Sequence, residues 1–365
     1  MDSIEQILNK AQFSKDDLVF LLNSTDGDRL KLFEKAKAVK AECIGKKVYF
    51  RGLIEYSNFC KKNCYYCGIR AGNSRYVRYR MTDQEVMEAV NYAYVNDYAS
   101  IVIQSGEQTN SAFIKKIENL LTRIQQETEG KIHVTLSLGE QTEDTYNRWF
   151  EAGAHRYLLR IEVSNPGLYI KLHPDNKSHD YHRRLEALTA LRRIGFQVGT
   201  GVMIGLPFQT ISDLADDLAF FRDFDIDMAG MGPYIEHPDT PLFRHRDTLL
   251  PLATRFDLSL KMVAILRIMM KNINIAATTA MQTIDPQGRE KALMVGANVI
   301  MPNLTPVKYR QDYLLYENKP CLDEEAEDCK SCLEARIHMA GDTIGYGEWG
   351  DSRHYKDRTE HKQEI

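Results

Sequence analysis

Three cysteines stand close together in the stretch Asn58-Phe59-Cys60-Lys61-Lys62-Asn63-Cys64-Tyr65-Tyr66-Cys67. The pattern is C-x3-C-x2-C, so one short loop supplies three thiolates, and an apolar segment leads into it. A structural zinc site and an electron-transfer iron–sulfur cluster each normally take four protein ligands. On a cube of four irons, three cysteines leave one iron free to bind a small molecule. The stretch therefore indicates an iron–sulfur site with one open position.

Two other interpretations of this stretch stay open. A distant histidine or cysteine could complete a zinc site, or the thiols could hold no metal. A disulfide framework is not expected, because the chain has seven cysteines, an odd number, and no apolar leader follows Met1. These features favour a reducing compartment, and we expect the protein in the cytoplasm.

The composition of the chain argues against two classes of partner. The chain has 365 residues, 43% of them hydrophobic, which is enough for one large domain or two ordinary ones. A net charge of −4 without a conspicuously basic stretch argues against binding of nucleic acid. No apolar run approaches the ~20 residues that cross a bilayer. We expect a protein that binds neither nucleic acid nor membrane.

Strand and helix patterns alternate along most of the chain. Residues 1–45 have the pattern of charged amphipathic helices. After them, strands are predicted at 48–54, 100–104, 133–138, 156–160, 197–204, 228–232, 274–277 and 298–300, and the helices between them at 82–96, 111–129, 142–152, 181–194, 210–222, 252–271 and 287–294. Eight such units in ~250 residues predict an α/β fold, a complete (βα)8 TIM-type barrel. The expected parts are a helical segment at 1–45 that caps the barrel, the barrel at 46–303 and a cysteine-containing C-terminal extension at 304–365.

Polar residues and glycines follow most of the predicted strands. In a parallel barrel the carboxyl ends of the strands meet on one face, where active sites form. The cysteine stretch follows the first strand, and later strands end in Gln104-Ser105-Gly106-Glu107, Ser137-Leu138-Gly139-Glu140, Arg160-Ile161-Glu162, Met203-Ile204-Gly205, Gly232-Pro233-Tyr234 and Thr278-Thr279-Ala280-Met281. Together these clusters predict one lined cavity.

A second cysteine group, C-x7-C-x2-C, follows the last predicted strand and consists of Cys321, Cys329 and Cys332. Its spacing suggests a second iron–sulfur cluster, [2Fe–2S] or [4Fe–4S], with unliganded thiols as the alternative. The intervening residues 322–328 are strongly acidic and are predicted to form a solvated loop, whose charge would weaken a thiolate site. Residues 336–365 are polar and are expected to form a variable tail, with disorder as one alternative. Cys43 stands alone and is expected to be an inert packed residue.

The motifs together resemble one family. The first cysteine stretch, with Tyr66 directly before its third cysteine, is similar to the signature of the radical S-adenosylmethionine (SAM) superfamily, in which SAM binds the open iron of a [4Fe–4S] cluster. A longer set resembles the HydE maturases of [FeFe]-hydrogenase, namely residues 51–58, 104–107, 135–140, 156–160, 205–207, 237–241, 277–281, 296–303 and 309–311 with the C-terminal C-x7-C-x2-C. The resemblance runs from about residue 45 to 335.

The resemblance implies a radical enzyme of the biotin-synthase-like branch. One electron would split SAM into methionine and a 5′-deoxyadenosyl radical, which would act on a small iron–carbonyl–cyanide cysteine precursor during assembly of the hydrogenase H-cluster. Other hydrogenase maturases and a reductase or ferredoxin electron donor are the implied partners. The alternatives are a related radical SAM enzyme of amino-acid or cofactor biosynthesis, biotin-synthase-like or methylornithine-synthase-like, and an iron–sulfur carrier without enzymatic activity.

Some side chains at the strand ends suit SAM by their chemistry alone. Gly106 lets the backbone approach closely, and Glu107 offers a carboxylate to an amino group. Arg184 is a candidate for the SAM carboxylate, because arginine presents a cationic fork. Glu162 is a candidate for the ribose hydroxyls or for holding Arg184, and an ion pair of these two residues is the structural alternative.

Two arginines, Arg51 and Arg160, lie in predicted strands, where inward positions of a barrel should be apolar. A buried cation needs an anion, so both are predicted to bind an anionic or metal-carboxylate substrate. The alternative is an internal salt bridge, from Arg51 to Glu55 or from Arg160 to Glu162. The histidines at 133, 155, 173 and 237 lack ligand spacing and are expected to have no role as ligands.

The resemblance also implies a role for individual residues. Positions that contact SAM are Gln104, Glu162, Arg184 and Met203, and positions that line the substrate cavity are Arg51, Arg160, Thr278, Thr279 and Tyr309. Tyr66, Gly106, Glu107 and Ser137 complete the predicted cofactor-binding set, and the two cysteine groups are the predicted cluster ligands. The chain departs from some members at Ile161-Glu162-Val163, where they have His-Glu-Thr, so the substrate could differ in detail.

Overall fold

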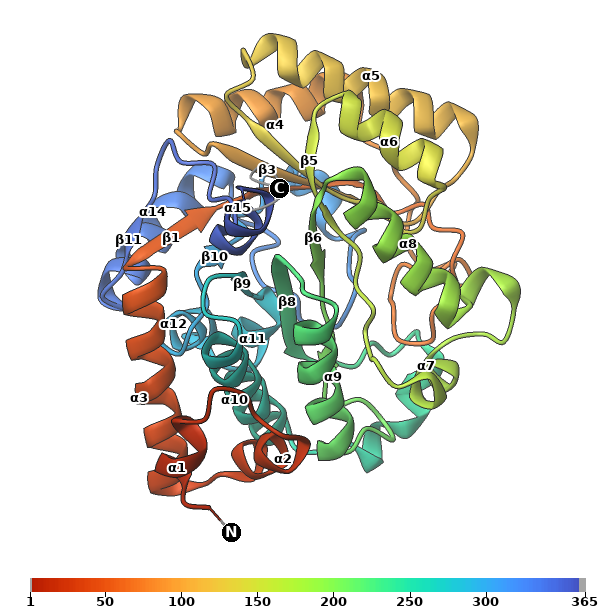
Figure 1. Cartoon of the computed structure of the whole chain (residues 1–365). Helices are drawn as coiled ribbons and strands as arrows, with labels where there is room; N and C mark the ends of the chain where they lie inside the picture. The colour runs from red at the N-terminus through yellow and green to blue at the C-terminus, as the bar shows by residue number, and fades with distance from the viewer. Residues whose placement is uncertain (1, 361–365) are drawn as a thin grey trace.

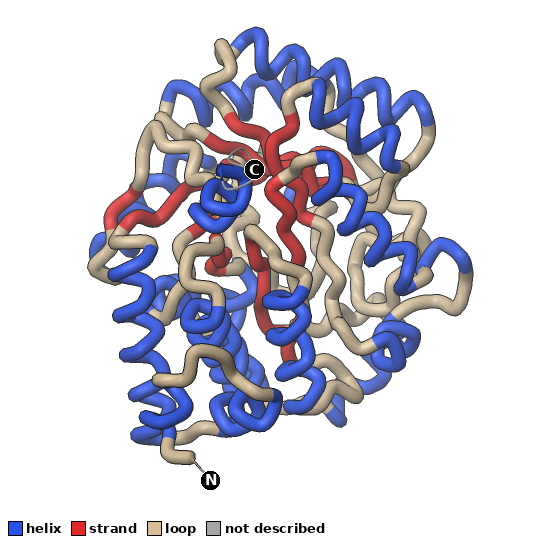
Figure 2. The backbone as a smooth tube through the Cα atoms, viewed as in Figure 1, coloured by secondary structure: helices blue, strands red, loops and turns tan. Residues whose placement is uncertain are grey.

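The strands of the computed structural model form one curled, parallel sheet (Figures 1 and 2). The structure describes residues 2–360, apart from the side chains of residues 328 and 329. The strands are β1 (Lys47–Phe50), β2 (Gly52–Ser57), β3 (Ser100–Ser105), β4 (His133–Ser137), β5 (Ala154–Leu158), β6 (Gln197–Thr200), β7 (Met203–Ile204), β8 (Met228–Pro233), β9 (Asn274–Ala277), β10 (Val299–Ile300) and β11 (Thr343–Ile344). Their order is β11-β1-β10-β9-β8-β6-β5-β4-β3-β2, and β7 pairs with β8.

Residues 47–57 contain both β1, which lies near one end of this order, and β2, which lies at the other end. Only Arg51 separates β1 from β2. β1 pairs with β10, with Tyr49 opposite Val299, and β2 pairs with β3, with Gly52 opposite Ile101. The predicted first strand is thus divided at Arg51, and the predicted fifth strand is likewise divided into β6 and β7.

Helices cover the outside of the curled sheet (Figure 1). They are α1 (Ile4–Leu8), α2 (Lys15–Asn23), α3 (Asp26–Cys43), α4 (Asp83–Val95), α5 (Ser111–Glu127), α6 (Glu143–Glu151), α7 (Pro166–Leu172), α8 (Tyr181–Ile194), α9 (Ile211–Asp223), α10 (Leu252–Met269), α11 (Thr279–Ile284), α12 (Gly288–Met294), α13 (Val307–Arg310), α14 (Ala326–Met339) and α15 (Arg353–Glu360), with short 3-10 helices η1 (Lys177–His179) and η2 (Pro241–Thr248). The N-terminal helices α2 and α3 pack on α9 and α10. Apolar strand residues and the inner faces of the helices form the main core between sheet and helices.

Local sequence explains where most of these helices begin. Thr82 caps α4, because its hydroxyl accepts from the Glu85 backbone N–H while the Glu85 carboxylate accepts from the Thr82 N–H. Thr210 and Asp213 form the same capping box at α9. Gly195 follows the C-terminal end of α8, adopts a left-handed conformation and ends the helix.

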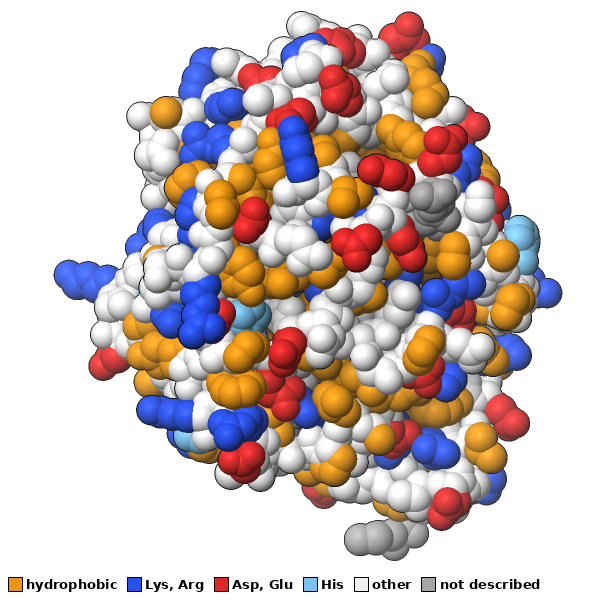
Figure 3. Space-filling model, turned by 180° about the vertical axis from the view of Figure 1, so that it is seen from behind, with side chains coloured by type: hydrophobic (Ala, Val, Ile, Leu, Met, Phe, Trp, Pro, Cys, Tyr) orange, Lys and Arg blue, Asp and Glu red, His pale blue; other side chains and the backbone are white. Residues whose placement is uncertain are grey.

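Figure 3 shows the face of the molecule that is turned away in Figure 1. The described surface there mixes acidic, basic and hydrophobic side chains.

Two expectations about the C-terminal part are wrong. The predicted acidic loop at 322–328 extends only to residue 325, because α14 begins at Ala326. Disorder, the alternative for the tail at 336–365, is wrong for residues 336–360, which hold the end of α14, β11 and α15; residues 361–365 lie outside the described residues. The polar composition of the segment misled the prediction, because a few side chains anchor it: Ile337 is buried in the main core, and the Tyr346 ring packs against Phe50 of β1.

The segment between β11 and α15 closes the amino-terminal ends of the strands. The Gly350 carbonyl accepts from Asn274, at the start of β9, at 2.8 Å and from Arg51 at 3.1 Å. The Asp351 carboxylate pairs with Arg156, and the Trp349 indole stacks on His133, the first residue of β4, with a centroid distance of 3.7 Å. The opposite, carboxyl-terminal ends of the strands are therefore the ends available for a site.

Candidate active site at the carboxyl ends of the strands

The cysteines lie in the loop between β2 and α4, and we call residues 58–80 the cysteine loop. Arg78 organises this loop from within. Its guanidinium donates hydrogen bonds of 2.5 to 2.8 Å to four backbone carbonyls, those of Asn58, Ile69, Arg70 and Asn73. Sequence reasoning missed Arg78, because six lysines and arginines occur between 58 and 80 and nothing in their spacing distinguishes one of them.

Of the three cysteines in the cysteine loop, Cys64 is buried, and Cys60 and Cys67 are half-buried. Burial raises the pKa of the Cys60 thiol, and it raises the pKa of Cys64 to about 12, with repulsion from Cys60 adding to the effect. Burial also raises the pKa of Cys67, and repulsion from both other sulfurs contributes, so the three thiols face one region. The Glu107 backbone N–H donates to the Cys60 Sγ at 3.3 Å. As free thiols these groups would be protonated and inert, whereas iron would compensate the charge of three thiolates.

The donor set of the cysteine loop fits an iron–sulfur cluster. Within the part of the chain that the structure describes, no three His, Cys, Asp or Glu side chains converge as ligands of one metal ion would. Each thiolate of a four-iron cube binds a different iron, so three cysteines of one loop can hold a [4Fe–4S] cluster with one open iron.

Two glycines let the strand ends approach the cysteine loop. A Cβ on Gly106, just after β3, would lie 2.4 Å from the Phe59 carbonyl oxygen and 2.6 Å from the Cys60 Cβ. Gly139 has φ +76°, and a Cβ there would lie 2.4 Å from the Glu107 Cγ. Side chains at these positions would push the loop or Glu107 away from the site.

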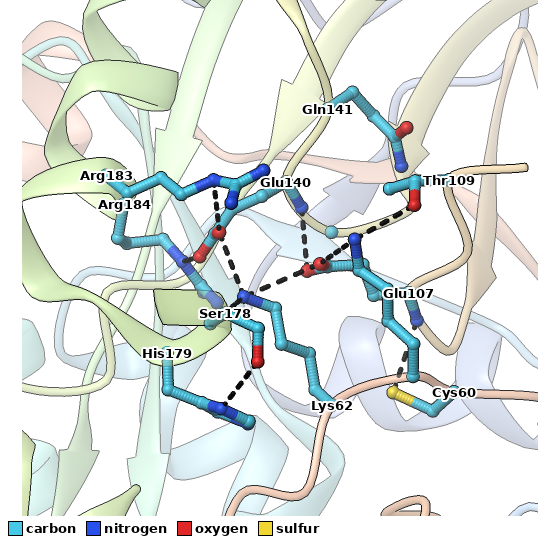
Figure 4. Close-up of polar contacts among 12 residues, drawn as sticks. Cys60, Lys62, Glu107, Thr109, Glu140, Gln141, Ser178, His179, Arg183 and Arg184 are labelled. Carbon is cyan, nitrogen blue, oxygen red and sulfur yellow. Dashed lines mark hydrogen bonds and ion pairs between the residues drawn. The ribbon is translucent and has the colours of Figure 1, made fainter. Parts of the chain in front are cut away.

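A network of buried charges joins the cysteine loop to three further elements (Figure 4). The Lys62 Nζ lies 2.9 Å from the Glu140 carboxylate and 3.5 Å from that of Glu107. The Glu140 backbone N–H donates to Glu107 at 2.9 Å, and Arg184 on α8 donates from Nε to Glu140. Burial opposes ionisation of Glu140, but the charges of Arg184 and Lys62 outweigh it and lower its pKa. One Glu107 oxygen, Oε1, has no hydrogen-bond donor within this network.

The expected alternative pairing of Glu162 with Arg184 is wrong. Arg184 pairs with Glu140 and also donates to the Arg160 carbonyl at 2.6 Å. Glu162 instead pairs with Arg160 through two hydrogen bonds of 2.8 and 2.9 Å, which is the internal salt bridge named as the alternative for that arginine. Glu162 has φ +67°, a conformation that costs energy for a residue other than glycine and is common at functional sites.

Several predicted site residues share one property. They lie at the carboxyl ends of strands amid buried neighbours, yet each keeps partial contact with solvent; they are Gln104, Ser137, Arg160, Met203, Thr278 and Thr279. Gln104 donates to the Tyr313 hydroxyl at 3.3 Å, and the Thr278 hydroxyl donates to the Met231 carbonyl at 3.0 Å. The structure thus brings these residues to the same end of the sheet as the cysteine loop.

The structure does not bring Arg51 together with this group, whereas Tyr309 packs on the cysteine loop, its ring stacked on that of Tyr79 with a centroid distance of 4.5 Å. The Arg51 guanidinium is fully buried at the amino-terminal ends of the strands, against Gly350. Burial and repulsion from Arg156 lower its pKa. In the described part of the chain no carboxylate pairs with Arg51, and Glu55, its expected alternative partner, pairs with Lys319. Tyr309, on α13, donates to the Glu85 carboxylate at 2.9 Å.

The second cysteine group is described only in part. Cys332 is exposed on α14, Cys321 is half-buried before it, and neither is in a disulfide. The side chain of Cys329 lies outside the described residues, so the second cluster stays a prediction.

Comparison with known proteins identifies the family. Residues 54–221 match the model of the Radical SAM superfamily. Over 350 residues the chain is 43% identical to the [FeFe] hydrogenase maturase subunit HydE of Thermotoga maritima, which covers 94% of this chain and 95% of that protein. The chain belongs to the HydE family. It is therefore a radical SAM enzyme, and a [4Fe–4S] cluster and SAM are the cofactors of its superfamily.

More distant relatives share the fold of this HydE-family chain. A 3-methylornithine synthase of Methanosarcina acetivorans is 25% identical over 90% of each chain. The crystal structure of methylornithine synthase matches with a TM-score of 0.78 at 21% identity, over 98% of this chain and 99% of that one. The maturase HydG from Carboxydothermus hydrogenoformans also matches with a TM-score of 0.78, at 20% identity, over 94% of this chain and 79% of that one.

Among residues 2–360, no helix is long and apolar enough to span a membrane.

Proposed function

We propose that this HydE-family enzyme cleaves SAM reductively and directs the 5′-deoxyadenosyl radical at a small iron–carbonyl–cyanide cysteine precursor of the [FeFe]-hydrogenase H-cluster. The observation that carries the proposal is the 43% identity to the Thermotoga HydE subunit along nearly the whole chain, combined with three cysteines in one loop. When bound, a [4Fe–4S] cluster supplies the electron for SAM cleavage. Cys60, Cys64 and Cys67 are the residues that would hold it.

The protein's part in SAM binding falls to the strand ends around these cysteines. Gly106 and Glu107 adjoin the cysteine loop and offer backbone and carboxylate acceptors to an ammonium group. Arg184 uses its Nε for Glu140 and one terminal nitrogen for the Arg160 carbonyl, and its positive charge would attract a carboxylate. The remaining proposed SAM contacts are Tyr66, Gln104, Ser137, Glu162 and Met203.

The proposed substrate contacts come from the same carboxyl ends of the strands. Arg160 carries a positive charge beside Glu162, and Thr278 and Thr279 add hydroxyls. An anionic metal complex suits such a lining, because a cation and hydroxyl donors replace its hydration. Arg51 would act on the substrate only from a distance, given the contacts described above, and Tyr309 would contribute from its place against the cysteine loop.

Four finer assignments complete the proposal. The sheet closes into a complete (βα)8 barrel, since β1 and β2, one residue apart, pair with strands on both sides of the order. A second iron–sulfur cluster binds at the C-terminal cysteines of the extension. Other hydrogenase maturases and a reductase or ferredoxin are the partners. The protein acts in the cytoplasm.

An anaerobic maturation mixture that lacks only HydE tests the function. Adding this protein to apo-[FeFe]-hydrogenase in that mixture should restore hydrogen evolution. If the same preparation forms 5′-deoxyadenosine but restores no hydrogenase activity, the precursor assignment is wrong. The methylornithine-synthase-like alternative, which the 25% identity over 90% of both chains supports, would then be examined first.

A further inference from the structure

A segment that sequence reasoning did not predict, residues 166–179, holds the cysteine loop from one side. It consists of α7, η1 and the turn between them. Tyr65 donates its backbone N–H to the Leu172 carbonyl at 3.0 Å, and Lys62 donates to the Ser178 carbonyl. Two further contacts run through histidine rings. All of these contacts reach loop residues between Cys60 and Cys67, so this segment fixes the part of the loop that carries the thiols.

The first ring, His173, contacts the residue directly before the third cysteine. The Tyr66 hydroxyl lies 3.1 Å from the His173 Nε2, and the His173 Nδ1 lies 2.9 Å from the Tyr169 carbonyl oxygen. A carbonyl can only accept, so the Nδ1 carries the hydrogen. In a neutral ring the Nε2 then accepts, and the Tyr66 hydroxyl is the donor.

The surroundings keep the His173 ring neutral and in place. Its side chain is 2% exposed, and burial lowers its pKa to about 3. The Tyr169 ring stacks on it with a centroid distance of 3.9 Å. The Tyr66 ring meets it edge-on, at 5.4 Å and 89°. The orientation of Tyr66 is therefore set by one hydrogen bond and one aromatic contact to the same histidine.

The second ring, His179, holds the loop backbone in the same way. The Asn63 N–H donates to the His179 Nε2 at 2.9 Å, and the Nδ1 lies 2.8 Å from the Asn176 side-chain oxygen. Asn63 immediately precedes Cys64. Both histidines thus use the Nε2 as an acceptor beside a cluster cysteine, and both use the Nδ1 to fix their own orientation.

We propose that His173 and His179 are positioning residues of the SAM site, which hold Tyr66 and the Asn63 backbone so that the cysteine loop presents a fixed surface to SAM. The inference rests on the proposed function, because it takes Tyr66 as a residue that contacts SAM. In this role the histidines act through Tyr66 and the loop backbone rather than as ligands.

A double-mutant cycle on the reconstituted enzyme tests the link between His173 and Tyr66. His173→Phe removes the acceptor and keeps an aromatic ring, and Tyr66→Phe removes only the donor. With dithionite as reductant, each variant is expected to raise the KM for SAM about 5- to 10-fold, because each loses one hydrogen bond. The kcat of each should stay within about twofold of the wild type. The double variant should resemble the single ones, because both remove the same bond.

Conservative and remote variants complete the experiment. His173→Gln keeps an acceptor and should recover most of the SAM affinity, and it serves with Tyr66→Phe if His173→Phe does not fold. His179→Leu should raise the KM by a similar factor. His155→Phe is the matched control, since His155 stacks on His133 near the amino-terminal ends of the strands, and it should leave the KM unchanged.

Two outcomes overturn the positioning role. In the first, the KM for SAM is the same in the wild type, Tyr66→Phe, His173→Phe and His173→Gln. In the second, the effects of the two single variants on the KM are strictly additive in the double variant. Either result, with a wild-type enzyme that cleaves SAM, leaves the proposed function standing. A wild-type protein that binds its cluster but cleaves no SAM overturns the proposed function instead.

Discussion

Lys62 and Glu140 form a buried ion pair, with the Nζ 2.9 Å from the carboxylate, that ties the cysteine loop to the end of β4. Both side chains are almost inaccessible to solvent. Because Arg184 pairs with the same carboxylate, Glu140 couples the loop that carries the thiols to the arginine proposed to bind SAM.

Replacing Glu140 should therefore disturb both partners at once. Glu140→Gln leaves the buried charges of Lys62 and Arg184 uncompensated, and removal of one member of such a pair costs about 3 kcal/mol. We expect a lower thermal midpoint and a raised KM for SAM. Glu143→Gln, which removes an exposed partner of Arg193, is the control and should change neither. A Glu140→Gln protein with wild-type midpoint and KM would contradict the coupling.

The Asp351 carboxylate should make stability depend on pH. Burial opposes its ionisation, but the His133 ring, whose Nδ1 lies 3.6 Å away, and the charge of Arg156 lower its pKa below the ordinary 3.8. A lowered pKa in the folded state means that the stabilisation is present above about pH 4 and is lost as the pH falls below it. Asp351→Asn should lower the urea midpoint at pH 7, and the difference from the wild type should shrink towards pH 3. A difference that is constant with pH would contradict this interpretation, and the exposed Asp144→Asn gives the baseline.

Arg78 should be needed for the cysteine loop to hold a cluster. Arg78→Met removes the donors to four loop carbonyls, so the loop loses its internal order before any ligand is changed. Because the variant loses several hydrogen bonds at once, we expect it to bind at most about half the wild-type iron per protein after anaerobic reconstitution. Arg75→Met, an exposed arginine of the same loop, should bind iron normally. Equal iron content in both variants would sink the idea.

Gly106 should tolerate no side chain. The Cβ in Gly106→Ala would meet the Phe59 carbonyl oxygen at 2.4 Å, so the loop or β3 must move. We expect loss of SAM cleavage with a thermal midpoint lowered by several degrees. Gly27→Ala, where nothing lies within 4 Å of the new Cβ, should behave as the wild type. Full activity of Gly106→Ala would show that the close approach is not required.

The sequence predicted those parts of the fold that depend on local patterns. The predicted helix ranges 82–96 and 181–194 agree with α4 and α8 within a residue or two. Alternating strands and helices predicted the parallel sheet, and glycines and charges after the strands predicted which end of it carries the site. These signals are local, so they can be read from neighbouring residues.

Long-range contacts are what the sequence concealed. Arg51 was predicted to bind substrate because a buried cation needs a partner. Its guanidinium instead donates to the Gly350 carbonyl, almost 300 residues later in the chain. The polar composition of the segment around Gly350 resembled that of a tail. Glu140 was grouped with the strand ends, yet its pairing with Lys62 and Arg184 depends on three elements. His173 and His179 lack ligand spacing, and only their position beside the cysteine loop gives them a role.

The central claim is that three thiols of the cysteine loop hold a cluster that cleaves SAM. The most direct test is the amount of 5′-deoxyadenosine formed from SAM by anaerobically reconstituted wild type, Cys64→Ala and Cys43→Ala, with dithionite as reductant. Cys43 ends α3, outside the site, and provides the matched control. We predict product from the wild type and from Cys43→Ala and none above background from Cys64→Ala. Undiminished product from Cys64→Ala would contradict the account.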